Sequence, residues 1–190
     1  MKHVLFQSFG LNIDANQTMI ENKIQEIEDN FDLVMIKEEF ETSIILLKEL
    51  LNWSYDDLKS LDLNTRMKDS KQFVSNDTRS KMKVWLSDDY QLYNHFKKKF
   101  QNMKIQFGLD RLQNELAKFK IVQENVRYKC PIEFVSKESL PEEDRPFGDV
   151  TQAYKMLNDD QECQQLGMQE LKFIKILNLW QNNRINRLAF

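Results

Sequence analysis

Residues 31–53 read FDLVMIKEEFETSIILLKELLNW, and this stretch predicts a strand that runs directly into an amphipathic helix. The apolar, partly β-branched start is typical of a strand covered on both faces, which we expect over 31–36. From Phe40 onward the apolar residues recur at helical spacing, which predicts a helix over 38–52. A strand that feeds a helix through a short turn is half of a βαβ unit. Glu38 is therefore expected at the carboxyl edge of a sheet, where open α/β folds bind ligands.

The composition indicates a globular chain. With 190 residues, 41% of them hydrophobic, and with 13 Phe and 3 Trp, the chain has enough apolar material for one core, as one domain or part of a larger one. The net charge of −3 directs it neither to nucleic acid nor to an acidic membrane. No apolar run approaches the roughly 20 residues that span a bilayer, and the first residues lack the apolar run of a signal peptide.

The remaining pattern is mostly helical. Helical spacing predicts helices over about 18–29, 80–85, 87–129 and 159–187, and Gly108 is expected to kink or break the third. The last helix is expected to turn one apolar face inward, and this face comprises Leu166, Leu171, Ile174, Leu177 and Trp180. Residues 4–6 predict a short strand and residues 64–80 a polar surface loop. The expected organisation is a domain part over 1–130, a linker over 131–158 and a carboxy-terminal helical segment over 159–190. The fold class is α/β and helix-rich.

The opening stretch resembles a segment of the galactose-3-O-sulfotransferase family, which includes galactosylceramide sulfotransferase. The matching residues are Phe31, Asp32, Leu33, Val34, Glu38, Phe40, Ser43, Leu46, Leu47, Leu50, Leu51 and Trp53. The likeness continues through 56–58, 63–64 and Arg66, resumes at 92–96, and then includes Phe100 and 107–111. Family-like spacing holds to about Cys130.

The resemblance implies a fold and an activity. It implies the carboxy-terminal part of a P-loop-like sulfotransferase fold, with short parallel strands followed by long helices. Such enzymes transfer sulfate from PAPS to the 3-hydroxyl of galactose on glycolipids or glycans, without a metal. It further implies a glycoprotein of the Golgi membrane that faces the lumen, anchored by a segment that this sequence does not contain.

The donor site of the family has no counterpart in the sequence. A phosphosulfate loop requires a strand, a turn rich in Gly, Lys and Ser or Thr, and then a helix. The four glycines are isolated, and none stands in such a setting. We therefore expect the donor-binding half and the catalytic residues upstream of Met1. This leaves open a non-catalytic, shortened paralogue that acts as a helical interaction module, or an unrelated cytosolic helical adaptor.

Four residues are candidates for the acceptor side. Glu38 can orient an acceptor hydroxyl or support a catalytic Lys or His, but a carboxylate here also stabilises a helix N-terminus. His95 can act as a base, although a lone histidine in an amphipathic helix more often packs or faces solvent. Trp53 can stack on a sugar or belong to the core. Arg66 can bind an anion or be solvated in its polar loop.

Secretory features are present but open to two interpretations. Three sequons place candidate N-glycosylation sites at Asn16, Asn52 and Asn76, of which Asn76 is favoured because its surroundings are polar. Cys130 and Cys163 can form a disulfide in an oxidising compartment or remain as buried free thiols. Neither belongs to a CxxC motif or a histidine cluster, so no metal site is expected.

Overall fold

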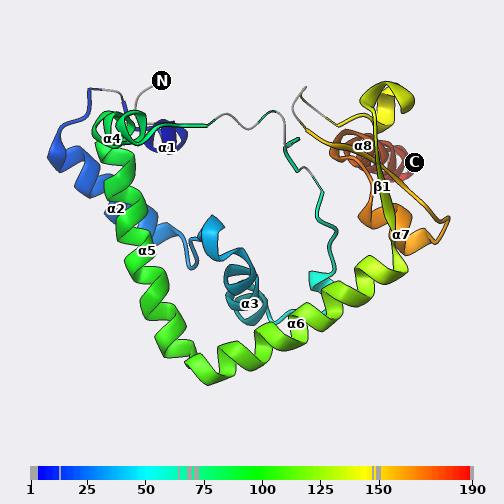
Figure 1. Cartoon of the computed structure of the whole chain (residues 1–190), viewed down its shortest axis with the longest axis horizontal. Helices are drawn as coiled ribbons and strands as arrows, with labels where there is room; N and C mark the ends of the chain where they lie inside the picture. The colour runs from blue at the N-terminus through cyan, green and yellow to red at the C-terminus, as the bar shows by residue number, and fades with distance from the viewer. Residues whose placement is uncertain are drawn as a thin grey trace. The chain divides into compact units, whose positions relative to one another are not determined.

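The computed structural model describes residues 4–12, 14–63, 65–67, 70, 73–146, 148 and 151–188. Helices dominate this part of the chain (Figure 1). The α-helices are α1 (Val4–Ser8), α2 (Gln17–Asn30), α3 (Phe40–Leu51), α4 (Asn76–Trp85), α5 (Ser87–Phe107), α6 (Leu109–Lys129), α7 (Gln161–Leu166) and α8 (Glu170–Leu188). Short 3-10 helices are η1 (Lys37–Glu39), η2 (Asp56–Leu58), η4 (Lys137–Ser139) and η5 (Glu142–Asp144). The chain divides into two compact units, residues 1–58 with 73–119, and residues 59–72 with 120–190.

Local sequence signals determine where several helices begin and end. Asn16 caps α2, because its side-chain oxygen accepts a hydrogen bond from the Met19 amide at 3.0 Å. Ser75 caps α4 in the same way through the Thr78 amide. Gly108 separates α5 from α6 at a φ of +93°, a conformation that L side chains rarely adopt. The predicted interruption at Gly108 is therefore confirmed.

The first unit is built on α5. Helices α1 and α2 lie beside α5 (Figure 1). They pack on it through a cluster of buried apolar side chains, which comprises Phe6, Leu11, Ile20, Ile27, Leu92 and Phe96. A second cluster joins α3 to the first part of α6 through Ile45, Leu58, Leu112 and Phe119. Ile36, Leu46 and Phe100 form a third cluster. The amphipathic patterns of 17–30 and 87–107 thus bury the faces that helical spacing predicts. In α3, Ile45 and Leu46 are buried, but Phe40, Leu50 and Leu51 are exposed.

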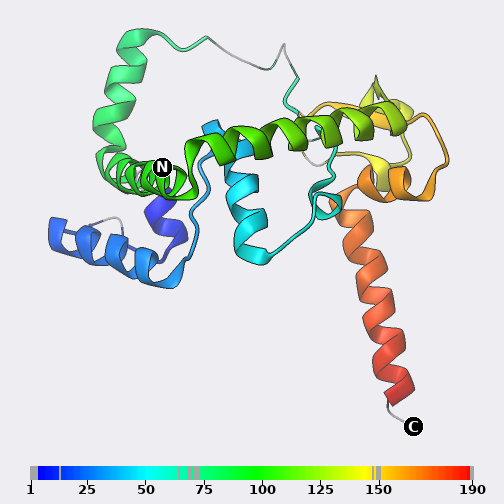
Figure 2. The same ribbon diagram turned by 90° about the horizontal axis from the view of Figure 1, so that it is seen from below.

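The second unit contains the only strands in the described ranges. Strands β1 (Ile132–Val135) and β2 (Ala153–Met156) pair antiparallel, with Ile132 opposite Met156 and Val135 opposite Ala153. Cys130, directly after α6, forms a disulfide with Cys163 of α7, and both residues are buried. In Figure 2, α8 extends away from the paired strands of its own unit.

Several sequence predictions are wrong. Residues 31–36 form no strand: Asp32 lies at a bend, and no strand of the described chain pairs with them. Within the described residues, Glu38 therefore does not lie at a sheet edge. Residues 4–6 lie within α1 and not in a strand, and Asn76 opens α4 and does not lie in a polar loop. The parallel strands of a P-loop-like fold are not seen in the described residues.

The carboxy-terminal helix also departs from its prediction. Gly167 ends α7, so the expected single helix is two helices, α7 and α8. The α8 side chains expected to point inward are largely exposed, with Leu171 at 57% and Trp180 at 68%. Helical spacing identifies an apolar face but not a surface that covers it. No helix in the described part of the chain is both long and apolar enough to cross a membrane.

Candidate functional site

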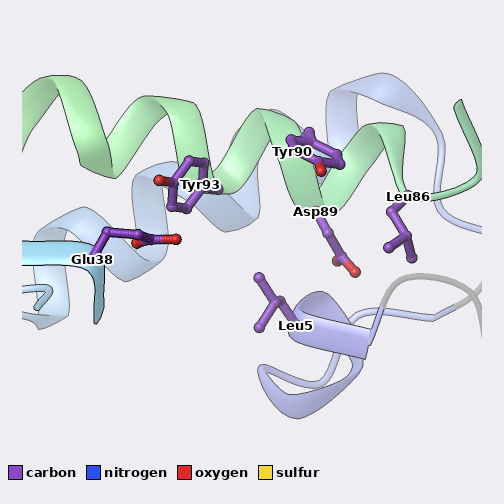
Figure 3. Close-up of a pocket in the computed structure, with 6 residues that line it drawn as sticks. All are labelled: Leu5, Glu38, Leu86, Asp89, Tyr90 and Tyr93. Atoms are coloured by element: carbon purple, nitrogen blue, oxygen red, sulfur yellow. The ribbon is translucent and has the colours of Figure 1, made fainter. Parts of the chain in front are cut away.

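A pocket of about 510 Å³ in the first unit brings two carboxylates and two tyrosines together (Figure 3). The described residues that line it are Leu5, Glu38, Leu86, Asp89, Tyr90 and Tyr93. Leu5 comes from α1 and Glu38 from η1, whereas the other four come from the start of α5 and the residue before it. Spacings of four residues, 86 to 90 and 89 to 93, place successive side chains one turn apart on that helix. The pocket therefore forms where α1 and η1 flank α5.

Asp89 connects α1 to this pocket. It is buried, and its Oδ1 accepts a hydrogen bond from the Phe6 amide at 3.4 Å. This bond satisfies one amide near the N-terminus of α1, where helices leave donors unpaired. Among the described residues, no hydrogen bond to the second carboxylate oxygen of Asp89 is present. Asp89 thus has a structural role and a place in the pocket wall.

The neighbouring residue fixes the position of Glu38. Glu39 accepts a hydrogen bond from Gln101 Nε2 at 2.5 Å and forms a short ion pair with Lys104, both on α5. The hydrogen bond from Lys104 lowers the pKa of Glu39, so this carboxylate stays charged and holds η1 on α5. Glu38 is exposed and extends its carboxylate into the pocket below Tyr93 (Figure 3).

This chemistry suits a polyhydroxylated ligand. Carboxylate oxygens accept hydrogen bonds from hydroxyl groups, and each phenol can both donate and accept one. Aromatic rings add apolar faces against which C–H groups pack. The Tyr93 ring also forms a cation–π contact with Lys97, whose Nζ lies 5.3 Å from the ring centroid. A sugar ring presents these complementary groups, so the pocket can bind and orient a saccharide.

The other candidates lie elsewhere. Trp53 follows α3, and its amide donates a hydrogen bond to the Lys48 carbonyl. Because its side chain is 42% exposed, Trp53 is not a core residue. His95 faces solvent on α5, where its Nε2 lies 2.6 Å from Glu28 Oε2. Hydrogen bonds from Lys99 and then from His95 lower the pKa of Glu28. Neither Trp53 nor His95 lines the pocket with Glu38.

Arg66 belongs to the second unit. Its Nε donates to Ser70 Oγ at 3.1 Å, and its backbone forms an isolated bridge with Thr151. Asn64, which is part of the sequence resemblance, lies outside the described residues. Of the three candidates in the first unit, only Glu38 lines the pocket.

The structure places the candidate N-glycosylation sites and the two cysteines. Asn16 uses its side-chain oxygen in capping α2, whereas Asn76 is exposed at the first position of α4. Asn52 ends α3 in the left-handed conformation at a φ of +52°. Cys130 and Cys163 are disulfide-bonded and not free. Within the described residues, no group of three or more His, Cys, Asp or Glu side chains is arranged to hold a metal ion.

Comparison with known proteins identifies the family. The family model described as galactose-3-O-sulfotransferase matches residues 1–139, which include every residue of the pocket. The chain belongs to the galactose-3-O-sulfotransferase family. Galactose-3-O-sulfotransferase 2 of Sus scrofa is 31% identical over 123 residues, covering 64% of this chain and 31% of that protein. Galactosylceramide sulfotransferase of Mus musculus is 30% identical over 132 residues, covering 68% of this chain and 31% of that protein.

These matches are limited in extent. The chain spans about a third of the length of the curated relatives it matches, 31% in both cases. The family-model match ends at 139, before β2, α7 and α8. No solved structure matches the chain.

A sulfotransferase family implies PAPS as the sulfate donor, and the described residues do not fit it. A phosphosulfate cradle needs backbone amides at a helix N-terminus that follows a strand, together with a cation. Gly108 follows a helix, Gly10 follows α1, and Gly148 and Gly167 do not stand between a strand and a helix beside Lys and a hydroxyl residue. We therefore assign no step of donor chemistry to residues of the described ranges.

Sequence reasoning missed most of the pocket. From the sequence, Asp89 could be interpreted only as an acidic residue that stabilises the first turn of a helix. Nothing in the sequence distinguished Tyr90 and Tyr93 from the other residues of that helix. A signal was present in the clustering of Asp89, Tyr90 and Tyr93 within five positions. It indicates a site only once η1 is known to lie against the same helix.

Proposed function

We propose that this chain is the carboxy-terminal, acceptor-binding part of a PAPS-dependent galactose 3-O-sulfotransferase. The observation that carries the proposal is the pocket of paired carboxylates and tyrosines, which lies wholly within the family match. The relatives bear names that specify galactose or galactosylceramide, which supports a galactose-terminated glycolipid or glycan as the acceptor. The parallel strands of a P-loop-like fold and the donor site belong to the part of the enzyme that this chain does not match.

In this proposal each lining residue has a role. Glu38 and Asp89 accept hydrogen bonds from sugar hydroxyls, and the ring of Tyr93 packs against the apolar face of the sugar. Leu5 and Leu86 line the pocket beside the group to which galactose is linked. The enzyme acts on the lumenal side of the Golgi membrane. The disulfide and the sequons support this, because disulfides persist in oxidising compartments and sequons are glycosylated in the secretory pathway.

Binding of methyl β-galactoside to the purified chain tests the acceptor site. Saturation-transfer NMR is expected to show binding that Tyr93→Ala and Glu38→Gln each weaken at least fivefold, because each removes a packing face or a charged acceptor. Matched controls are Tyr128→Ala, an exposed tyrosine of the second unit, and Glu41→Gln, an exposed carboxylate of α3. Equal binding by all four variants, or preference for methyl β-glucoside, would refute the acceptor site.

A second candidate is a non-catalytic paralogue that serves as a helical interaction module. The exposed apolar side chains of α8, together with the lack of a donor cradle in the described ranges, favour it. Calorimetric titration of the purified chain with methyl β-galactoside separates the two functions, because an interaction module needs no sugar site. Binding that Tyr93→Ala weakens would refute the interaction module as the sole function.

A further inference from the structure

We propose that α8 pairs antiparallel with α8 of a second copy of this chain, through one exposed apolar stripe that carries opposite charges at its two ends. The inference goes beyond the proposed function and does not depend on it, because the saccharide pocket lies in the first unit and α8 lies in the second. The α8 stripe consists of Glu170, Phe173, Ile174, Leu177, Trp180 and Arg184.

The residues of the α8 stripe share one face of the helix. Five of them recur at alternating spacings of three and four positions, from Glu170 through Leu177 to Arg184, and Ile174 flanks this row. Such spacing keeps side chains on one face and is the spacing that paired helices use. Every residue of the stripe is exposed, and Trp180 is the most exposed of its apolar members. A row of large apolar side chains that faces water favours burial against a partner.

Helix α8 contacts its own unit away from the stripe. Its first turn contacts η5, where Lys172 Nζ lies 2.7 Å from Asp144 Oδ1, and Lys172 is not part of the stripe. Beyond this turn, α8 extends away from the paired strands of its unit (Figure 2). A helix in a protein owes most of its stability in water to the packing of one apolar face. A partner along the stripe therefore stabilises α8.

The charges at the two ends select the partner and its orientation. Glu170 and Arg184 lie roughly 21 Å apart along the helix axis at 1.5 Å per residue, so they cannot pair within one helix. Among the described residues, neither forms an ion pair or a side-chain hydrogen bond. In an antiparallel pair of α8 helices, Glu170 of each copy meets Arg184 of the other. A parallel pair places like charges together, which is unfavourable.

The apolar residues fit the same two-fold arrangement, in which one surface must be complementary to itself. Leu177 lies at the centre of the stripe, equally distant in sequence from Glu170 and Arg184. In the antiparallel pair Leu177 therefore meets its own copy, and Ile174 meets Trp180, which lies equally far on the other side of the centre. One helix pair is a small interface, so a dissociation constant on the order of 10 μM is expected.

Sedimentation equilibrium of the purified 190-residue chain tests the pairing. The chain is expected to be a monomer at about 1 μM and mostly a dimer at about 200 μM. Leu177→Asp is expected to weaken association at least tenfold, because two carboxylates then meet at the centre of the pair. The matched control is Leu179→Asp, which changes an exposed leucine of α8 outside the stripe and is expected to leave association unchanged.

Exchange of the end charges tests the orientation. Glu170→Arg and Arg184→Glu are each expected to weaken association about fivefold, since each places like charges together at both ends of the pair. Mixed in equal amounts, the two single variants are expected to form a heterodimer with the affinity of the parent, because opposite charges then meet at both ends. The double variant is expected to associate as the parent does for the same reason.

Three results would overturn the proposal. They are a monomer at every concentration, equal effects of Leu177→Asp and Leu179→Asp, and no gain in association when the two charge variants are mixed. Circular dichroism of each variant checks that its helices are retained. Tyr93→Ala, which alters the saccharide pocket, is expected to associate as the parent does, so failure of the pairing is distinguishable from failure of the acceptor site.

Discussion

At the scale of single residues, Glu115 is a carboxylate that several partners keep ionised. Tyr55 Oη donates to Glu115 Oε2 at 2.7 Å, and the ammonium groups of Lys118 and Lys48 lie 3.1 Å and 3.2 Å from its oxygens. The hydrogen bond from Tyr55 is the main cause that lowers the pKa of Glu115 to about 2. Burial, and then the hydrogen bond to Glu115, raise the pKa of Tyr55. The cluster joins α3 and the loop after it to α6.

The low pKa of Glu115 predicts a dependence of stability on pH. The folded value lies below the unfolded one, so the stabilisation is fully present above pH 4.5 and is lost as the pH falls toward 2. Glu115→Gln is expected to reduce this acid-dependent loss in the free energy of unfolding by about 1–2 kcal/mol. Urea unfolding between pH 2 and 6 measures it. The control is Glu124→Gln, an exposed residue of the same helix, and an identical acid profile for both variants would contradict the assignment.

At the scale of elements, periodicity predicted the helices well and the strands poorly. Helices α2, α3, α5 and α6 follow 3.6-residue patterns whose buried faces form the core clusters. A strand also depends on a partner that may lie far away in sequence, and the apolar run at 31–36 has none in the described chain. Strands β1 and β2 are four residues long and partly polar, so their local pattern is too weak to predict them.

For the candidate site too, the sequence predicted local features and missed contacts between distant residues. Glu38 lines the pocket, as a residue of a candidate site should. The cause is the packing of η1 on α5, whereas the sequence predicted the end of a sheet strand. That packing depends on Glu39, which lies 62 positions from its partner Gln101 and 65 from its partner Lys104. No local pattern relates such distant residues, so the sequence indicated one member of the site and not the site itself.

The junction between α5 and α6 gives a prediction at this scale. Gly108→Ala is expected to destabilise the fold by about 1–3 kcal/mol, because alanine must adopt the φ of +93° that glycine accepts freely. Steric contact is not the cause, since the nearest atom to an added Cβ is Arg111 Cβ at 3.8 Å. Thermal unfolding by circular dichroism measures the change. Gln106→Ala, exposed in α5, is the control, and equal stability of the two variants would show that the strain is relieved elsewhere.

At the scale of the whole molecule, the stabilising contacts fall into two sets. The Glu115 cluster and the three apolar clusters lie in the first unit. The disulfide, the paired strands and the ion pairs of Glu162 with Lys59 and Lys129 lie in the second. Because each set closes within its own unit, the two units are expected to lose stability independently when one set is weakened.

The disulfide tests that independence. Replacing Cys130 and Cys163 together by alanine is expected to destabilise the second unit by about 2–4 kcal/mol, because the unfolded chain regains the freedom that the cross-link removed. Hydrogen exchange is expected to accelerate at the amides of β1, β2 and α7, while the buried amides of α2 and α5 keep their rates. Reduction of the parent protein should reproduce the effect, and the double variant should not respond to reductant. Equal acceleration of exchange in both units would contradict this prediction. It would mean that the two units unfold as one cooperative structure, in which loss of the disulfide lowers the free energy of unfolding of both units equally.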